Sequence, residues 1–107
     1  MTFRKEKIHE LYKNLAAEFV TVVSAGPALI TVTHAEVAPN EKIVKIFFTV
    51  LPDDQENGVE NFLNRKRSEF VEFIEKKAKI GRMPNIEFKI DVGEKNRQRI
   101  DFLLKSE

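Results

Sequence analysis

The segment from residue 29 to residue 51 constrains the fold more than any other part of this chain. Two runs rich in β-branched and other apolar residues flank Pro39-Asn40-Glu41-Lys42, a short polar stretch with strong turn formers. Apolar runs on both sides of a short turn are typical of two antiparallel strands. We therefore predict strands near residues 28–37 and 42–51, joined as a hairpin.

Apolar residues alternate along the second predicted strand, and the face that they share should be the core face. These residues are Val44, Ile46, Phe48 and Val50. In the first strand the apolar phase changes between Val32 and Ala35, and a β-bulge around Thr33-His34 would reconcile the two halves. Phe47 falls on the second face beside Lys45, where either a neighbouring side chain or a nucleobase could cover it.

Two helices are predicted around the hairpin. The first covers residues 3–21 and should end before Ser24-Ala25-Gly26-Pro27. Its apolar stripe at helical spacing consists of Ile8, Leu11, Tyr12, Leu15, Ala16 and Phe19. The second begins near Val59, and its stripe is interrupted before it resumes at Phe70.

Lys66 and Arg67 occupy the positions where the second stripe should continue. Burying both cations would be costly, so we predict a kink or break within residues 64–69, with both side chains reaching solvent. Ser68 is the predicted N-cap of the second segment, with Glu69 in its first turn. Gly81 is the predicted cap at its end.

A third strand and a terminal helix complete the predicted order. The strand follows from the alternating residues Ile86, Phe88, Ile90 and Val92. Ile100, Leu103 and Leu104 suggest a short closing helix. We predict an α+β fold of order α-β-β-α(kinked)-β, with a three-stranded sheet and helices on one face. A chain of 107 residues has the length of one domain, residues 1–107.

Charge is nearly balanced overall, so any binding to nucleic acid must depend on where the cations lie. The chain has 18 Lys and Arg against 17 Asp and Glu. Between residues 65 and 82, three Glu face seven cations, which we predict to contact phosphates: Arg65, Lys66, Arg67, Lys76, Lys77, Lys79 and Arg82. A second candidate cluster lies at the start of the first helix, where cations interact unfavourably with the helix dipole: Arg4, Lys5 and Lys7. The alternative is a solvated helix face with i,i+4 pairs such as Glu72 with Lys76 and Glu75 with Lys79.

The sequence offers little for catalysis or metal binding. No Cys is present, and His9 and His34 are far apart in the sequence. The acidic loop from residue 53 to 56 is expected to offer no buried pocket that could shift the pKa of its carboxyl groups. The Gly-x-x-Gly phosphate clamp of ordinary KH domains is absent. We expect no enzyme, with no catalytic residue, metal, cofactor or small-molecule substrate. No apolar run could span a membrane and none resembles a signal peptide, so we expect a soluble cytoplasmic protein without membrane contact.

Several motifs occur together in a particular order along the chain. The hairpin reads Ile30-Thr-Val-Thr-His-Ala-Glu-Val-Ala-Pro-Asn40 and then Val44-Lys-Ile-Phe-Phe-Thr-Val-Leu51. Met83-Pro84-Asn85-Ile86-Glu87-Phe88 and Arg99-Ile100-Asp101-Phe102-Leu103-Leu104 follow, and Asn64-Arg65 opens the predicted helix break. In these motifs the chain resembles the bacterial ribosome-binding factor A family over nearly its whole length. It departs from the family where Lys66-Arg67-Ser68 stands in place of an Ala-x-Gly break.

The resemblance implies a type II KH-like fold with the third strand beside the first. It also implies a non-catalytic assembly factor that binds the small ribosomal subunit and its RNA during late maturation and rRNA processing, before initiation. Members of this family are associated with growth in the cold. We expect a monomer. The rival hypothesis is an α/β protein-interaction module that pairs with a partner through an exposed sheet face or edge.

Overall fold

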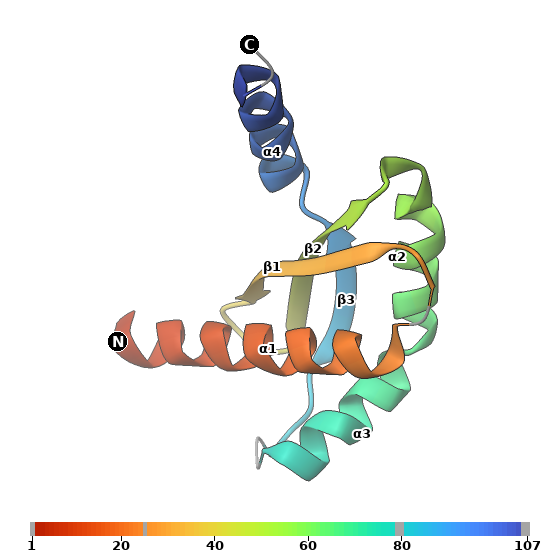
Figure 1. The fold of residues 1–107 in the computed structure, drawn as a ribbon. Helices are drawn as coiled ribbons and strands as arrows, with labels where there is room; N and C mark the ends of the chain where they lie inside the picture. Colours follow the sequence, from red (N-terminus) through yellow and green to blue (C-terminus); the bar gives the residue numbers. More distant parts are fainter. Residues whose placement is uncertain (1, 25, 79–80, 106–107) are drawn as a thin grey trace.

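A three-stranded sheet flanked by helices makes up the described part of the chain (Figure 1). The computed structural model describes residues 2–24, 26–78 and 81–105, with side chains from residue 6 onward. The elements in chain order are α1 (Thr2–Val23), β1 (Leu29–Val37), β2 (Ile43–Leu51), the 3-10 helix η1 (Asp53–Gln55), α2 (Glu56–Arg65), α3 (Arg67–Lys77), β3 (Asn85–Ile90) and α4 (Val92–Lys105). The predicted α-β-β-α-β order with an interrupted helix is confirmed.

The sheet has the order β1-β2-β3. β1 and β2 are antiparallel, and their register shifts between Val32 and His34, which confirms the predicted bulge. β3 runs parallel to β2, with Val44 opposite Ile86. The expectation that β3 would lie beside β1 is therefore wrong. β2 is the most apolar of the three strands, and the central position lets it bury that surface between two neighbours.

The core lies between the sheet and α1, α2 and α3. The predicted core face of β2 is confirmed, since its four alternating residues from Val44 to Val50 are buried. In α1 the predicted stripe is buried at its centre, but Leu11 is 39% exposed and Val20 is buried instead. Leu11 lies at the margin of the stripe, so α1 is rotated by a fraction of a turn from the predicted orientation.

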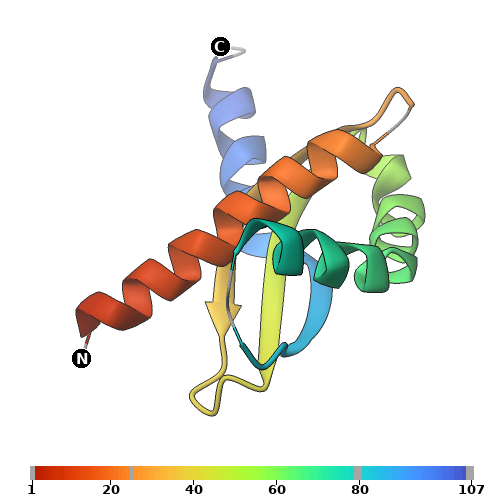
Figure 2. The same cartoon turned by 90° about the horizontal axis from the view of Figure 1, so that it is seen from below.

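Aromatic side chains join α3 to α1 and to the sheet. The ring centroid of Phe70 lies 5.0 Å from that of Phe19 on α1 and 5.6 Å from that of Phe88 on β3. Phe70 and Phe88 are buried. Contacts of this kind add geometric preference to the burial of a large apolar surface. They hold α3 beside α1 on the core face of the sheet (Figure 2).

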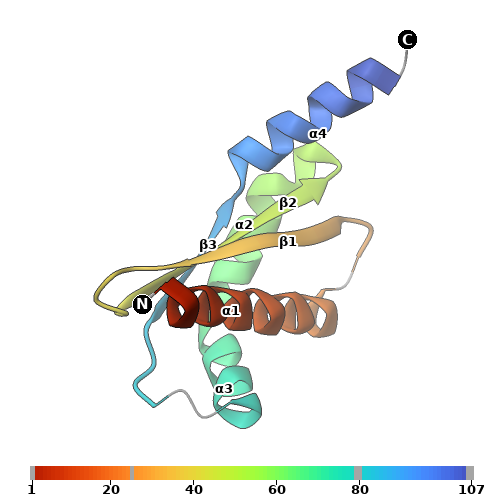
Figure 3. The ribbon, with the colours of Figure 1, turned by 90° about the vertical axis from the view of Figure 1, so that its left-hand side faces the viewer.

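The end of the chain differs from the prediction. β3 ends at Ile90, and Val92 begins α4 instead of continuing the strand. The reason is a helix cap, because Asp91 Oδ1 accepts a hydrogen bond of 2.9 Å from the Glu94 N–H. α4 is longer than the short closing helix we predicted. It extends over the sheet face opposite α1 (Figure 3), and none of its described side chains is buried.

Candidate nucleic-acid interface

The helix that carries most of the candidate cations is interrupted at Lys66. α2 ends at Arg65 and α3 begins at Arg67, with Lys66 at φ −94° and ψ 10° between them. The predicted break within residues 64–69 is confirmed. Ser68 is not the N-cap, since α3 already begins one residue earlier and no side chain caps it. Ala78, not Gly81, is the C-cap residue of α3.

Three consecutive cations lie at this break, and we call them the break cluster: Arg65, Lys66 and Arg67. The Lys66 ammonium lies 3.3 Å from Glu69 Oε1 and 5.7 Å from the centroid of the Phe62 ring. Arg67 Nε donates a 2.8 Å hydrogen bond to the Asn64 carbonyl, while the side chain stays exposed. Within the described residues, Arg65 is exposed and forms no ion pair. The break therefore presents positive charge at the surface.

Lys76 and Lys77 lie at the other end of α3 and Arg82 lies in the loop that precedes β3, and we call these three residues the end cluster. The Lys77 ammonium lies 2.9 Å from Glu18 Oε1 on α1 and 5.5 Å from the Phe73 ring centroid. Lys76 is exposed and forms no ion pair with Glu72, although both residues are described. Lys79, and with it the suggested Glu75–Lys79 pair, lies outside the described residues.

The two clusters do not share one face of α3. Arg67 and Lys76 are nine residues apart, which is about 180° around a helix at about 100° per residue. The outward surface between them carries Glu69, Glu72 and Glu75, all exposed. A phosphate chain along α3 would therefore meet alternating charge, so each cluster has to act as a separate contact point.

The cations at the start of the chain lie elsewhere. The first turns of α1 project past the sheet, away from the junction of α2 and α3 (Figures 1 and 2). Lys7 is exposed, and the side chains of Arg4 and Lys5 lie outside the described residues. The structure does not bring this group together with the break cluster.

A shallow hollow of about 580 Å³ lies beside the break, between α2 and the outer edge of β3. We call it the edge hollow, and it is lined by Glu60, Asn64, Arg67, Glu87, Phe88, Lys89, Ile90 and Val92. The positive charges of two cations and the negative charges of two carboxylates cancel among its lining residues. Lys89 was not among the predicted site residues, although the period-two pattern of β3 already placed it on the outward face.

The open face of the sheet carries a stacked pair of rings. His34 and Phe47 lie 4.5 Å apart between ring centroids, with only 4° between their planes. A neighbouring side chain thus covers one face of Phe47, as one of the two alternatives anticipated. His34 Nδ1 also lies 3.2 Å from Asp91 Oδ2, and its Nε2 lies 3.5 Å from Glu36 Oε1. These carboxylates make the surroundings of the rings a poor place for phosphate.

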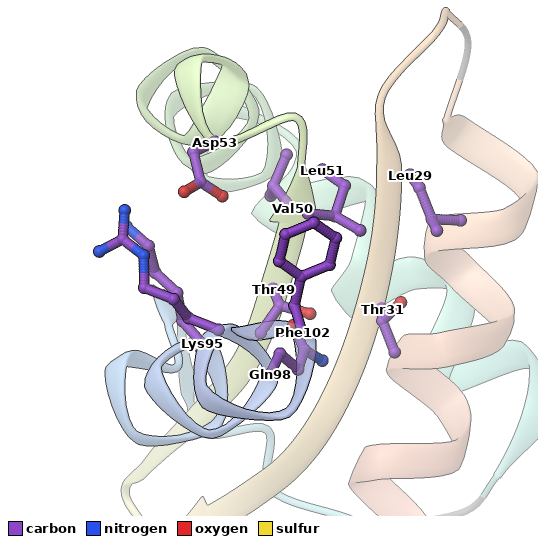
Figure 4. A pocket seen from close by; sticks show the side chains of 10 residues that line it. Leu29, Thr31, Thr49, Val50, Leu51, Asp53, Lys95, Gln98 and Phe102 are labelled. Carbon is purple, nitrogen blue, oxygen red and sulfur yellow. The ribbon is translucent and has the colours of Figure 1, made fainter. Parts of the chain in front are cut away.

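A second hollow, of about 460 Å³, separates α4 from the end of the open face (Figure 4). We call it the face hollow, and it is lined by Leu29, Thr31, Thr49, Val50, Leu51, Asp53, Lys95, Gln98, Arg99 and Phe102. Leu29, Leu51 and Phe102 are all more than half exposed. Its surface is mainly apolar, which suits a protein side chain better than a phosphate.

The two histidines have separate structural contacts. The Val37 N–H donates a 3.4 Å hydrogen bond to His9 Nε2, whereas His34 stacks on Phe47. In the parts of the chain that the structure describes, no group of three or more His, Asp or Glu side chains is arranged to hold a metal ion. The described helices also include none that is both long enough and apolar enough to span a bilayer.

Comparison with known proteins gives a consistent result. A family model described as ribosome-binding factor A matches residues 4–104. Relatives of that name from Geotalea daltonii and Geotalea uraniireducens are each 29% identical to the chain, covering 95% of it and 85% and 86% of their own lengths.

Solved structures show the same fold. The crystal structure of ribosome-binding factor A from Thermus thermophilus has a TM-score of 0.73 at 18% identity, covering 80% of this chain and 93% of that one. The solution NMR structure of a Thermotoga maritima protein proposed to be a ribosome-binding factor A has a TM-score of 0.72 at 21% identity, covering 87% and 92%. These matches confirm the predicted KH-like α+β fold. Because the family model spans nearly the whole chain, this protein belongs to the ribosome-binding factor A family.

Proposed function

We propose that this protein is a non-catalytic assembly factor that binds the small ribosomal subunit and its RNA during late maturation. The observation that carries the proposal is the break cluster, three adjacent cations at a helix junction in a member of a ribosome-binding family. The protein would act in the cytoplasm, and the need for it would be greatest in the cold. The RNA is a partner and not a substrate in this proposal.

The break cluster supports phosphate binding through its chemistry. Arg65 and Arg67 carry planar guanidinium groups, which can donate paired hydrogen bonds to phosphate oxygens, and Lys66 adds a point charge. The Nε of Arg67 is already bonded to a carbonyl, which leaves its terminal nitrogens for a ligand. Lys76 and Lys77 would form a second contact, roughly 14 Å further along α3, and Arg82 in the loop before β3 would add to it. Lys79, Arg4, Lys5 and Lys7 remain candidate contacts.

The edges of the sheet argue against the rival mode of edge pairing. On the outer edge of β3, Asn64 binds the backbone of Phe88 and Glu60 accepts the Ile90 N–H. On β1, His9 accepts the Val37 N–H. An incoming strand would have to displace these side chains. Because side chains of the same chain already bond to both outer edges of the sheet, we also expect a monomer in solution.

A protein contact through the open sheet face is the second candidate function. The face hollow favours it, because Leu29, Leu51 and Phe102 expose apolar surface there without cover from the described chain. Association through such a surface would depend little on salt. Binding to RNA through cations would depend on it strongly, because phosphate contacts release counterions.

Co-sedimentation with isolated small subunits tests the proposal. Immature and mature subunits are each mixed with the protein at salt concentrations between about 50 and 200 mM. We expect tighter binding to immature subunits and a steep linear fall of log affinity with log salt concentration. Binding that does not change with salt would favour the protein-contact function, and no binding to either particle would contradict the assembly role.

A further inference from the structure

Neither Pro nor Gly accounts for the break between α2 and α3. Sharp interruptions of helices occur at Pro, at Gly and Ser pairs, or where a side chain enters the backbone ladder. Residues 60–67 contain neither Pro nor Gly, and Ser68 already lies within α3. The Lys66 N–H is shared between the carbonyls of Phe62 at 3.2 Å and Leu63 at 3.0 Å, which marks a tightened last turn. Lys66 and Arg67 interrupt the apolar stripe, but where α2 stops and how α3 leaves it must also depend on what holds α2 from outside.

The outer edge of β3 supplies an anchor point. Odd-numbered residues of this segment bond to β2, since the Asn85 N–H donates to Lys42 O and the Asp91 N–H to Phe48 O, each at 2.8 Å. Because backbone groups alternate in direction along a strand, those of Phe88 and Ile90 point away from β2. Phe88 is almost completely buried, so its outward N–H and C=O need partners from the protein.

Asn64 provides both partners for Phe88. Its Oδ1 accepts the Phe88 N–H at 3.0 Å, and its Nδ2 donates to the Phe88 carbonyl at 3.1 Å. Nδ2 also donates to the Glu60 carbonyl at 3.0 Å, within α2 itself. One primary amide therefore replaces a neighbouring strand at Phe88. No other side-chain type of this size can donate and accept in this way.

Two further contacts extend the connection in both directions. Glu60, one turn earlier on the same side of α2, accepts the Ile90 N–H at 3.1 Å through Oε2. Arg67, just beyond the break, donates through Nε to the carbonyl of Asn64 at 2.8 Å. The last turn of α2 is thus attached to β3, and the first residue of α3 is attached to that turn.

We propose that Asn64 is the positioning residue that fixes where α2 stops against β3 and the direction in which α3 leaves it. Through this role Asn64 sets the placement of the break cluster, and this part of the proposal rests on the proposed function. Asn64 need not touch RNA. Because its amide is bonded to Phe88, the position of β3 determines the orientation of α3, the helix that carries the cations.

Asn64→Asp is the sharpest variant, because it keeps the shape and the acceptor but removes the donor. A carboxylate at this position would face the carbonyls of Phe88 and Glu60 without a proton to share. Asn61→Asp is the matched control, since it adds the same charge to an exposed position of the same helix. Asn64→Gln is a milder second variant that keeps the amide but places it one methylene group further out.

The direction of α3 can be measured without using the cations. The chain has no Cys, so Glu72→Cys on α3 and Glu36→Cys on β1 give two unique sites for nitroxide labels. Both positions are exposed and lie outside the proposed contacts. We expect Asn64→Asp to shift or broaden the distribution of label distances, Asn64→Gln to shift it, and Asn61→Asp to leave it unchanged. Unchanged distances in the folded Asn64 variants would overturn the positioning role, and Asn64→Gln serves alone if Asn64→Asp does not fold.

Binding to small subunits separates this proposal from the proposed function. We expect Asn64→Asp to weaken binding between about twofold and tenfold relative to Asn61→Asp. Equal binding by these two variants would overturn the link between Asn64 and the break cluster. If the unmutated protein shows no salt-dependent binding at all, the proposed function fails, while the label distances still decide what Asn64 does to α3.

Discussion

Asp91 connects three parts of the chain through one carboxylate. Its Oδ1 caps α4, and its Oδ2 accepts a 2.6 Å hydrogen bond from the Thr33 hydroxyl in the β1 bulge. Burial alone would raise the pKa of Asp91. The hydrogen bonds from Glu94 N–H and Thr33, together with nearby His34, outweigh burial and hold this pKa below its ordinary value of 3.8. The ionised carboxylate is therefore favoured in the folded state.

Replacing Asp91 with Asn should destabilise the protein in a pH-dependent way. A group with a lowered pKa in the folded state stabilises it above the ordinary pKa, and that stabilisation is lost as the pH falls through the lower folded value. We expect a loss of about 0.5–2 kcal/mol at pH 7, in the range of helix caps. Urea unfolding at neutral pH and below pH 3.8 measures this difference, which should shrink in acid.

Asp101→Asn is a suitable control for the Asp91 measurement. Asp101 is an exposed carboxylate of α4 that lies 3.7 Å from Arg97. An exposed ion pair of this kind contributes little to stability. A difference between Asp91→Asn and the unmutated protein that stays constant down to acid pH would show that the charge of Asp91 has no part in the cap.

Among the elements, α3 is held by its apolar face while its charged face remains open. Phe70 packs between Phe19 and Phe88, whereas Lys76 and Glu72 reach solvent. α4 presents the opposite case, because its Phe102 is 70% exposed. The stability of the fold should therefore depend on α3 far more than on α4.

Phe70→Ala should cost about 3–5 kcal/mol of unfolding free energy, because it removes a buried ring and leaves a cavity. Phe102→Ala removes the same side chain from an exposed site, where changes usually stay within about 0.5 kcal/mol. Chemical unfolding of both variants provides the comparison. Similar losses in the two would mean that α4 packs on the sheet more closely than the structure indicates.

The elements also show what the sequence could and could not predict. The break at Lys66 was predictable, because two cations in an apolar stripe cannot be buried without partners. The contact between Asn64 and β3 was not predictable. It depends on a strand that follows about twenty residues later, and the pairing of that strand cannot be derived from periodicity. Alternation predicts a strand that continues to Val92, although Asp91 and Glu94 already form the sequence signature of a helix cap.

For the whole molecule, local patterns predicted the layers but not the arrangement between them. Alternation in β2 identified the core face, and the helical stripe of α1 identified its partner. The order of the strands and the face on which α4 lies depend on contacts between distant segments. The same holds for the candidate site, because the cations were predictable as a group whereas their division into two clusters requires the geometry of α3.

The break cluster is tested most directly by reversing two of its charges while keeping the Arg67 contact across the break. Arg65→Glu and Lys66→Glu together change the net charge by four units, and Arg67 is kept because its Nε binds the Asn64 carbonyl. Lys42→Glu with Lys105→Glu makes the same change on exposed positions that line neither the edge hollow nor the face hollow. Thermal unfolding first establishes that both double variants are folded.

The decisive measurement is the affinity of these folded double variants for immature small subunits as a function of salt. We predict that Arg65→Glu/Lys66→Glu lowers the affinity by at least about tenfold and flattens the plot of log affinity against log salt by about one unit for each phosphate that the variant no longer binds. The Lys42→Glu/Lys105→Glu control should stay close to the unmutated protein. Affinity and salt slope equal to those of the unmutated protein in Arg65→Glu/Lys66→Glu would contradict a role of the break cluster in binding RNA.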